Sequence, residues 1–157
     1  MSYIDNEYSN DNGKKELDRI FPNSDGIFKN PKPSALVRRL IKMACDKKDA
    51  VILDFFAGSG TTLQAVAQLN SEDGGQRQTI LCQINEKTGE NPNGIAYDVT
   101  AERSKRICTG TGYHGEADFP WCNDNKPYNE NLDVYEMESV HDSETVEGKT
   151  AIDVIDE

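Results

Sequence analysis

The sequence is poor in several features that would assign it to a class at once. Apolar residues make up 36 % of its 157 residues, below the ~45–50 % of ordinary globular domains, so we expect part of the chain to pack poorly. No apolar run reaches the ~18 residues of a membrane-spanning helix, and no charged-then-apolar signal stands at the N-terminus. We therefore expect a soluble, cytoplasmic protein with no membrane partner.

Metal-binding and disulfide patterns are also missing. The four cysteines lie far apart and form no C-x-x-C pair: Cys45, Cys82, Cys108 and Cys122. We therefore expect no zinc site, and we expect the four thiols to be reduced and mostly structural. The two histidines, His114 and His141, belong to no ligand pattern; we expect each to be exposed or locally bonded.

The formal charge of −11 is unevenly distributed. Residues 114–157 contain 13 acidic residues and two lysines, whereas residues 1–113 contain 15 residues of each sign. An acidic stretch with few apolar residues is typical of a solvated or disordered tail. It also repels DNA phosphates, so we do not expect this chain alone to bind duplex DNA tightly.

The apolar periodicity predicts alternating helices and strands. We expect a short helix at 13–20, a helix that Ser34 caps and that runs to about Asp46, a helix at 61–70, and a helix at 101–108 capped by Thr100. The expected strands are 51–56, 79–84 and, more weakly, 131–137, and residues 150–157 resemble the start of a further helix. This alternation implies an α/β fold with a parallel sheet and right-handed crossovers.

The most informative stretch is the strand–turn–helix junction at 53–62, which reads Leu-Asp-Phe-Phe-Ala-Gly-Ser-Gly-Thr-Thr. Ligands of open α/β sheets bind at the carboxyl ends of strands, where a helix N-terminus favours anionic groups. Gly58 and Gly60 permit a tight turn and a close approach to a ligand. No Lys follows Gly60 as a P-loop requires, and Leu63 replaces the third glycine of the dinucleotide motif. Two alternative interpretations remain: a tight turn that binds no ligand, and half of a nucleotide-binding oxidoreductase domain. The missing third glycine weakens the second.

This string resembles the S-adenosylmethionine motif of the amino-group DNA methyltransferases, the N6-adenine and N4-cytosine enzymes. Residues 28–33 are similar to the Phe-x-x-Pro-Lys-Pro element of that family, and residues 94–106 also resemble a stretch of these enzymes. The order of the pieces resembles the beta class, in which the catalytic half precedes the cofactor half. More narrowly, it resembles the modification subunit of type III restriction systems, well over residues 13–110 and loosely over 128–157.

The resemblance implies a partial Rossmann-like parallel sheet of the S-adenosylmethionine-dependent methyltransferase type, with S-adenosyl-L-methionine as cofactor. Asp54 is expected to pair with the methionine ammonium, and helix N–H groups with the hydroxyls of Ser59, Thr61 and Thr62 to hold the carboxylate. Glu86 is expected to accept hydrogen bonds from the ribose hydroxyls, unless it is a solvated loop residue. The implied cofactor-binding residues are Lys32, Pro33, Asp54, Phe55, Phe56, Ala57, Gly58, Ser59, Gly60, Thr61, Thr62 and Glu86.

The catalytic tetrapeptide of that family, Asp-Pro-Pro-Tyr or a similar string, is missing. The sequence has six prolines, and no two of them are adjacent. In the family this motif clamps the flipped base beside the methyl donor. No target-recognition segment is visible either, so we assign no catalytic residue to this chain. Either the catalytic half lies upstream in a longer protein or the chain is a truncated gene product.

The expected organisation is a flexible N-terminal segment at 1–27, a partial methyltransferase cofactor-binding domain at 28–140, and an acidic, truncated tail at 141–157. The expected function is that of an S-adenosylmethionine-binding fragment of a site-specific adenine-N6 DNA methyltransferase in a restriction-modification system, inactive alone. It would reach DNA through the missing parts, with a restriction subunit or a complementing catalytic half as partner. A non-catalytic remnant or interaction module with an unoccupied nucleotide pocket is the alternative.

Overall fold

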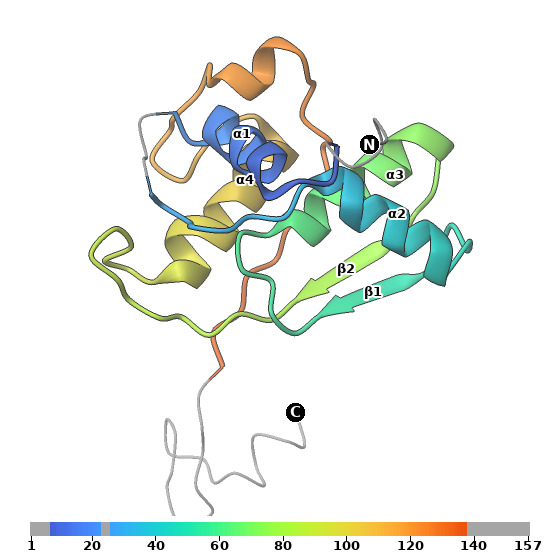
Figure 1. The fold of residues 1–157 in the computed structure, drawn as a ribbon, viewed down its shortest axis with the longest axis horizontal. Helices are drawn as coiled ribbons and strands as arrows, with labels where there is room; N and C mark the ends of the chain where they lie inside the picture. Colours follow the sequence, from blue (N-terminus) through green and yellow to red (C-terminus); the bar gives the residue numbers. More distant parts are fainter. Residues whose placement is uncertain (1–6, 23–25, 138–157) are drawn as a thin grey trace, which may run out of the picture.

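The structure, a computed structural model, describes residues 7–22 and 26–137 (Figure 1). The first helix of this part of the chain is α1 (Asn10–Ile20), and from α2 (Ser34–Ala44) on helices and strands alternate: β1 (Val51–Asp54), α3 (Thr61–Asp73), β2 (Gln78–Leu81) and α4 (Glu102–Thr109). A π-helix, η1 (Ala96–Ala101), leads directly into α4, and a short 3-10 helix, η2 (Pro120–Asn123), follows it.

The sheet consists of β1 and β2, which run parallel with Val51 opposite Gln78 and Asp54 opposite Leu81. The helix α3 makes the crossover between them, so both strands point toward the same end of the sheet (Figure 1). Cys82 N–H donates to the Asp54 carbonyl at 2.8 Å, one residue beyond the paired strands. The predicted α/β class with a parallel sheet is confirmed in this coarse form, and the Rossmann-like type stays a prediction. Both strands are shorter than predicted.

The predicted third strand at 131–137 is wrong, because the structure gives this segment no regular secondary structure. The chain just before it is tied to the last turn of α4, where Tyr128 N–H and Asn129 N–H donate to carbonyls at 107 and 108. The Tyr97 hydroxyl then contacts the Glu136 carboxylate at 3.2 Å, and proximity to that charge raises the pKa of Tyr97. The residues before the segment are thus bonded to α4, and Glu136 within it contacts η1; neither of these contacts is with the sheet. The predicted helix at 150–157 and the predicted acidic tail at 141–157 lie outside the described residues.

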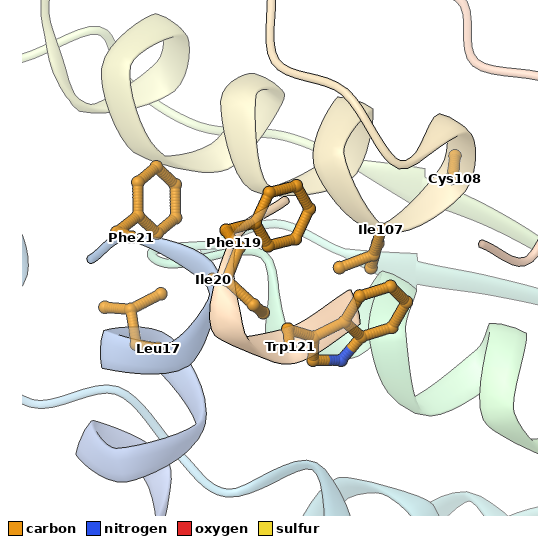
Figure 2. Close-up of a cluster of buried hydrophobic side chains, with 7 residues drawn as sticks. All are labelled: Leu17, Ile20, Phe21, Ile107, Cys108, Phe119 and Trp121. Atoms are coloured by element: carbon orange, nitrogen blue, oxygen red, sulfur yellow. The ribbon is translucent and has the colours of Figure 1, made fainter. Parts of the chain in front are cut away.

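Two hydrophobic clusters form the core. The first joins α1, α4 and the η2 region through Leu17, Ile20, Phe21, Ile107, Cys108, Phe119 and Trp121 (Figure 2). The second lies between α2, α3 and β1 and consists of Ile41, Ala65, Val66 and Leu69, with Val37 and Ile52 packed against it. The helix predicted at 13–20 is therefore confirmed and contributes directly to the core. The domain boundaries at 27, 140 and 141 stay predictions.

Only one face of the sheet is covered. Figure 1 shows α2 and α3 along one side of the strands, and among the residues that the structure describes no helix lies on the opposite side. On that open face Val51, Leu53 and Ile80 are 57, 47 and 51 % exposed. Parallel sheets are almost always buried on both faces, so this apolar surface is unusual. Within the same described ranges, no helix is long and apolar enough to cross a membrane.

Two predicted helix caps are wrong. Ser34 is the first residue of α2 rather than its cap, because the carboxylate of Glu16 from α1 accepts both its N–H, at 3.0 Å, and its hydroxyl, at 3.1 Å. Thr100 lies inside the continuous helical segment formed by η1 and α4, and its hydroxyl donates to the Gly58 carbonyl at 2.6 Å. In both cases a tertiary contact takes the hydroxyl that a local cap was expected to use.

Candidate functional site

The candidate site is built around residues 55–60, which we call the glycine-rich turn. It connects the carboxyl end of β1 to the start of α3. Gly58 and Gly60 have φ values of 53° and 75°, a left-handed conformation that side chains with a Cβ disfavour. The N-cap of α3 is Gly60, and it provides no side-chain cap. The first N–H groups of this helix therefore depend on other acceptors, which is the usual arrangement at an anion-binding helix N-terminus.

Asp54 organises this turn from the last position of β1. One carboxylate oxygen accepts the Phe56 N–H at 3.0 Å, and the other accepts the hydroxyl of Thr62 at 2.5 Å. The carboxylate therefore bridges the two ends of the glycine-rich turn. An ionised carboxylate offers about four lone-pair positions, so these two bonds leave capacity for a cationic partner.

A cleft of about 280 Å³ opens beside Asp54. Eight of the twelve residues predicted to bind the cofactor line it: Lys32, Asp54, Phe56, Ala57, Gly58, Ser59, Thr61 and Thr62. Three further lining residues were not among those predicted: Phe28, Asn30 and Val37. Phe28 and Asn30 belong to the same proline-containing element as Lys32, which is the sequence signal that could have identified them. The volume lies just below the ~300–1,000 Å³ of small-molecule sites.

Four predicted residues do not line the cleft. Pro33 is buried at the N-cap of α2, and Gly60 is buried against η1. Phe55 is 64 % exposed. Glu86 is exposed on the loop after β2, where its carbonyl accepts the Ile95 N–H at 2.9 Å. The structure thus gathers the glycine-rich turn and the Lys32 element and leaves Glu86 apart from them.

The element around Lys32 forms the second wall of the cleft. The Lys32 carbonyl accepts the Thr61 hydroxyl at 3.1 Å, while its ammonium reaches Asn10 at 3.0 Å. The helix α1 approaches the same element so closely that a Cβ on Gly13 would stand 2.1 Å from the Pro31 carbonyl oxygen. Gly13 therefore has a packing reason to lie inside a helix, where glycine is otherwise unfavourable.

The hydroxyls of Ser59 and Thr61 are engaged inside the protein. Both accept hydrogen bonds from Nη1 of Arg103, at 3.1 and 3.0 Å, and the same nitrogen donates to the Ser59 carbonyl at 3.1 Å. Ser59 and Thr61 are only 3 and 5 % exposed. Their hydroxyls therefore hold the turn in place from behind, and no feature of the sequence singled out Arg103.

Two more residues outside the predicted set hold the glycine-rich turn. The Gln83 side-chain oxygen, from the segment after β2, accepts the Gly58 N–H at 2.7 Å. Thr100 donates to the Gly58 carbonyl from η1, and its own carbonyl oxygen would stand 3.3 Å from a Cβ on Gly60. π-Helical segments recur at functional sites, and this one packs directly on the turn.

A larger cleft, of about 590 Å³, lies between α3 and residues 124–130. None of the residues predicted from the sequence lines it, and its lining includes the charged side chains of Arg38, Glu72 and Lys126. We place the candidate site at the smaller cleft because the strand end, the helix N-terminus and the predicted residues meet there. Across residues 7–22 and 26–137, no group of three metal-ligating side chains forms a metal centre.

Comparison with known proteins gives consistent matches to DNA methylases. The family described as "DNA methylase" matches residues 2–107. The chain is 54 % identical over 90 residues to the type III restriction-modification enzyme StyLTI Mod subunit of Salmonella typhimurium, covering 57 % of this chain and 13 % of that protein. It is 36 % identical over 107 residues to the EcoPI Mod subunit of Escherichia phage P1, covering 64 and 16 %.

A type II relative also matches. The chain is 43 % identical over 81 residues to the type II methyltransferase M.KpnI of Klebsiella pneumoniae, covering 52 % of this chain and 19 % of that protein. The matched regions therefore span less than a fifth of the length of each of these relatives.

Proposed function

This chain belongs to the DNA methylase family, and from that membership we propose that it binds S-adenosyl-L-methionine in the cleft beside Asp54. In the proposal it is the cofactor-binding part of an adenine-N6 DNA methyltransferase of a restriction-modification system. The single observation that carries the proposal is the cleft itself. Its walls unite a carboxylate at a strand end, a glycine-rich turn and the N-terminus of α3.

The cleft has the charges that the methionine part of the cofactor needs. In the proposal the Asp54 carboxylate accepts the ammonium, and the first N–H groups of α3 hold the carboxylate. Thr62, whose hydroxyl already contacts Asp54, orients that acid. Because the hydroxyls of Ser59 and Thr61 are bonded to Arg103, we assign them to holding the turn rather than to contacting the cofactor.

Glu86 is proposed to bind the ribose. Asp54 is the last residue of β1, and Glu86 lies on the loop that follows β2. Because the two strands are parallel, both acids lie toward the carboxyl end of the sheet. The exposed position of Glu86 leaves its carboxylate available to a ligand that extends from the cleft toward the loop after β2.

The rest of the methyltransferase is proposed to come from other segments. The sequence contains no Pro-Pro-aromatic tetrapeptide, and the open sheet face exposes Val51, Leu53 and Ile80. A segment that carries the tetrapeptide and packs on this face would bury the apolar surface and complete the wall of the cleft. DNA and a restriction subunit are the proposed partners of that assembly, since the family is described as DNA methylase and two relatives are Mod subunits of type III restriction-modification enzymes.

Calorimetric titration with S-adenosylhomocysteine, the demethylated product, tests cofactor binding. We expect weak binding by the folded chain and none of NADH. Asp54→Ala and Glu86→Ala should each weaken binding by ~1–3 kcal/mol, the usual effect of removing a charge-assisted partner. Glu90→Ala is the matched control, since Glu90 is an exposed acid of the same loop with no assigned role. Absence of heat with folded protein would favour the non-catalytic remnant, and unchanged affinity in both variants would refute the site.

Transfer of tritiated methyl groups to mixed-sequence DNA tests the division of labour. We expect no transfer by the chain alone, and transfer after addition of a chain that carries the tetrapeptide. Leu53→Lys should prevent that restoration while leaving binding of S-adenosylhomocysteine unchanged, because Leu53 lies on the open face and outside the cleft. Clear transfer by the 157 residues alone would refute the proposal that catalysis needs another segment.

A further inference from the structure

The guanidinium of Arg103 is fully buried directly behind the glycine-rich turn. Arg103 as a whole is 0 % exposed. It links helices of the two hydrophobic clusters, since it is carried by α4 of the first cluster and bonds to Gln64 on α3 of the second. A buried cation is costly unless its donors and its charge are satisfied, so the partners of this one are informative.

The donors of Arg103 divide between two targets. Nε and Nη2 both donate to the side-chain oxygen of Gln64 on α3, at 3.1 and 2.8 Å. Nη1 faces the turn and donates to Ser59 and Thr61. Gln64 thus sets the orientation of the guanidinium plane, and Nη1 is thereby aimed at the backbone of the turn.

The same guanidinium faces the other wall of the cleft through Glu16. Nη2 lies 3.9 Å from the Glu16 carboxylate, which is the group that accepts the N–H and hydroxyl of Ser34 at the start of α2. Ser34 follows Lys32 and Pro33 directly, and Thr61 bonds the Lys32 carbonyl. Arg103 is therefore linked to the glycine-rich turn on one side and to the Lys32 element on the other.

The charge balance around Arg103 differs from that of an ordinary buried ion pair. All its hydrogen-bond acceptors named above are neutral oxygens, and Glu16, beyond hydrogen-bond distance, is the acid that faces it. Burial lowers the pKa of Arg103 to about 10, opposed by the negative charge of Glu16, so the group remains charged at neutral pH. Its positive charge is thus placed behind the turn rather than neutralised at contact distance.

We propose that Arg103 is a positioning residue for the cofactor: it sets the separation of the two cleft walls and the conformation of the glycine-rich turn without touching the ligand. This inference rests on the proposed function, because it assumes that the cleft binds S-adenosylmethionine. It adds a residue from α4, distant in sequence, to the determinants of that binding.

Arg106 on the same helix provides a matched control. It is also buried, but it is ion-paired at contact distance, with Glu102 at 2.6 Å, and it donates to the Ile20 carbonyl at 2.8 Å. Its guanidinium lies 4.7 Å from the centre of the Phe21 ring, inside the first cluster. Its contacts connect α4 to α1 and to residues 116–119, and they do not include the glycine-rich turn, so its loss should affect stability alone.

The experiment compares Arg103→Lys with Arg106→Lys in the full chain. A lysine keeps the charge but has one nitrogen, which cannot bond Gln64 and the turn in the same geometry. We expect Arg103→Lys to raise the dissociation constant of S-adenosylhomocysteine about tenfold, as loss of one or two charge-assisted bonds does. Arg106→Lys should leave this dissociation constant within about twofold of the wild-type value, even if it lowers the urea midpoint of unfolding as much as Arg103→Lys does.

A second readout does not depend on the cofactor. Amide hydrogen exchange of residues 58–62 should accelerate in Arg103→Lys and not in Arg106→Lys. Gln64→Asn, which shortens the acceptor by one methylene, is the milder variant and should raise the dissociation constant about threefold, so the test survives if Arg103→Lys does not fold.

The outcomes separate the two proposals. No binding by the wild type, with faster exchange at 58–62 in Arg103→Lys, would refute the proposed function and support the role of Arg103 in holding the turn. Binding by the wild type with equal affinity in Arg103→Lys and Gln64→Asn would leave the function intact and overturn this inference. Equal loss of affinity in Arg103→Lys and Arg106→Lys would also overturn it, because a general loss of stability would then explain the effect.

Discussion

Replacement of Gly60 by alanine tests how tightly the glycine-rich turn is packed. Gly60 has a φ of 75°, and a Cβ there would lie 3.3 Å from the Thr100 carbonyl oxygen. The left-handed conformation costs alanine roughly 1–2 kcal/mol. The close contact forces Thr100 to shift, and its hydroxyl bond of 2.6 Å to Gly58 would weaken, which adds about 1 kcal/mol. We therefore expect Gly60→Ala to lower the free energy of unfolding by roughly 2–3 kcal/mol.

Gly74 offers a matched control for this experiment. It has a nearly identical φ of 68°, and a Cβ there would meet nothing within 4 Å. Gly74→Ala should therefore lower the free energy of unfolding only by the cost of the left-handed conformation, roughly 1–2 kcal/mol. Urea unfolding followed by circular dichroism measures both. With a slope of ~2 kcal/mol/M, the extra 1 kcal/mol separates the midpoints by about 0.5 M. Equal losses in the two variants would refute the claim that Thr100 packs tightly against the turn.

Three further predictions concern other parts of the molecule. The hydrogen bond from Arg77 lowers the pKa of Asp73 from 3.8 to about 2, so its stabilising contribution is present above pH 3.8 and lost as the pH falls toward 2. Urea midpoints measured over this range should fall less steeply in Asp73→Asn, and an unchanged pH dependence would contradict the linkage. Burial raises the pKa of the Cys108 thiol to about 11. Iodoacetamide should therefore label Cys108 much more slowly than the half-buried Cys45, as mass spectrometry can measure. Equal labelling rates would count against the burial of Cys108. Trp121 is 4 % exposed, so Trp121→Ala should cost ~3–5 kcal/mol in thermal or urea unfolding, and a cost below about 1 kcal/mol would place it outside the core.

Much of the fold was predictable because its signals are local. The β-branched residues before Asp54 and at 79–80 favour strands, and the apolar spacing in 34–44 and 61–70 predicts helices. The glycine-rich turn was also recognisable, since glycines at a strand–helix junction permit the left-handed φ values that the structure contains. The errors came where a hydroxyl or a short apolar run had two possible partners. Ser34 and Thr100 bond to other elements instead of capping helices, and residues 131–137 form no strand.

The sequence by itself determined the class of the protein and the position of its glycine-rich motif, because both depend on residues that are adjacent in the chain. Only the tertiary structure decided which groups hold that motif in place. Gln83 and Arg103 contact the turn from positions 25 and 44 residues away, and Gln64 on α3 bonds Arg103. No periodicity of the sequence indicates such contacts. The open face of the sheet is likewise a property of packing. Val51 and Ile80 have the composition of a buried strand, and only the arrangement of the helices leaves them exposed.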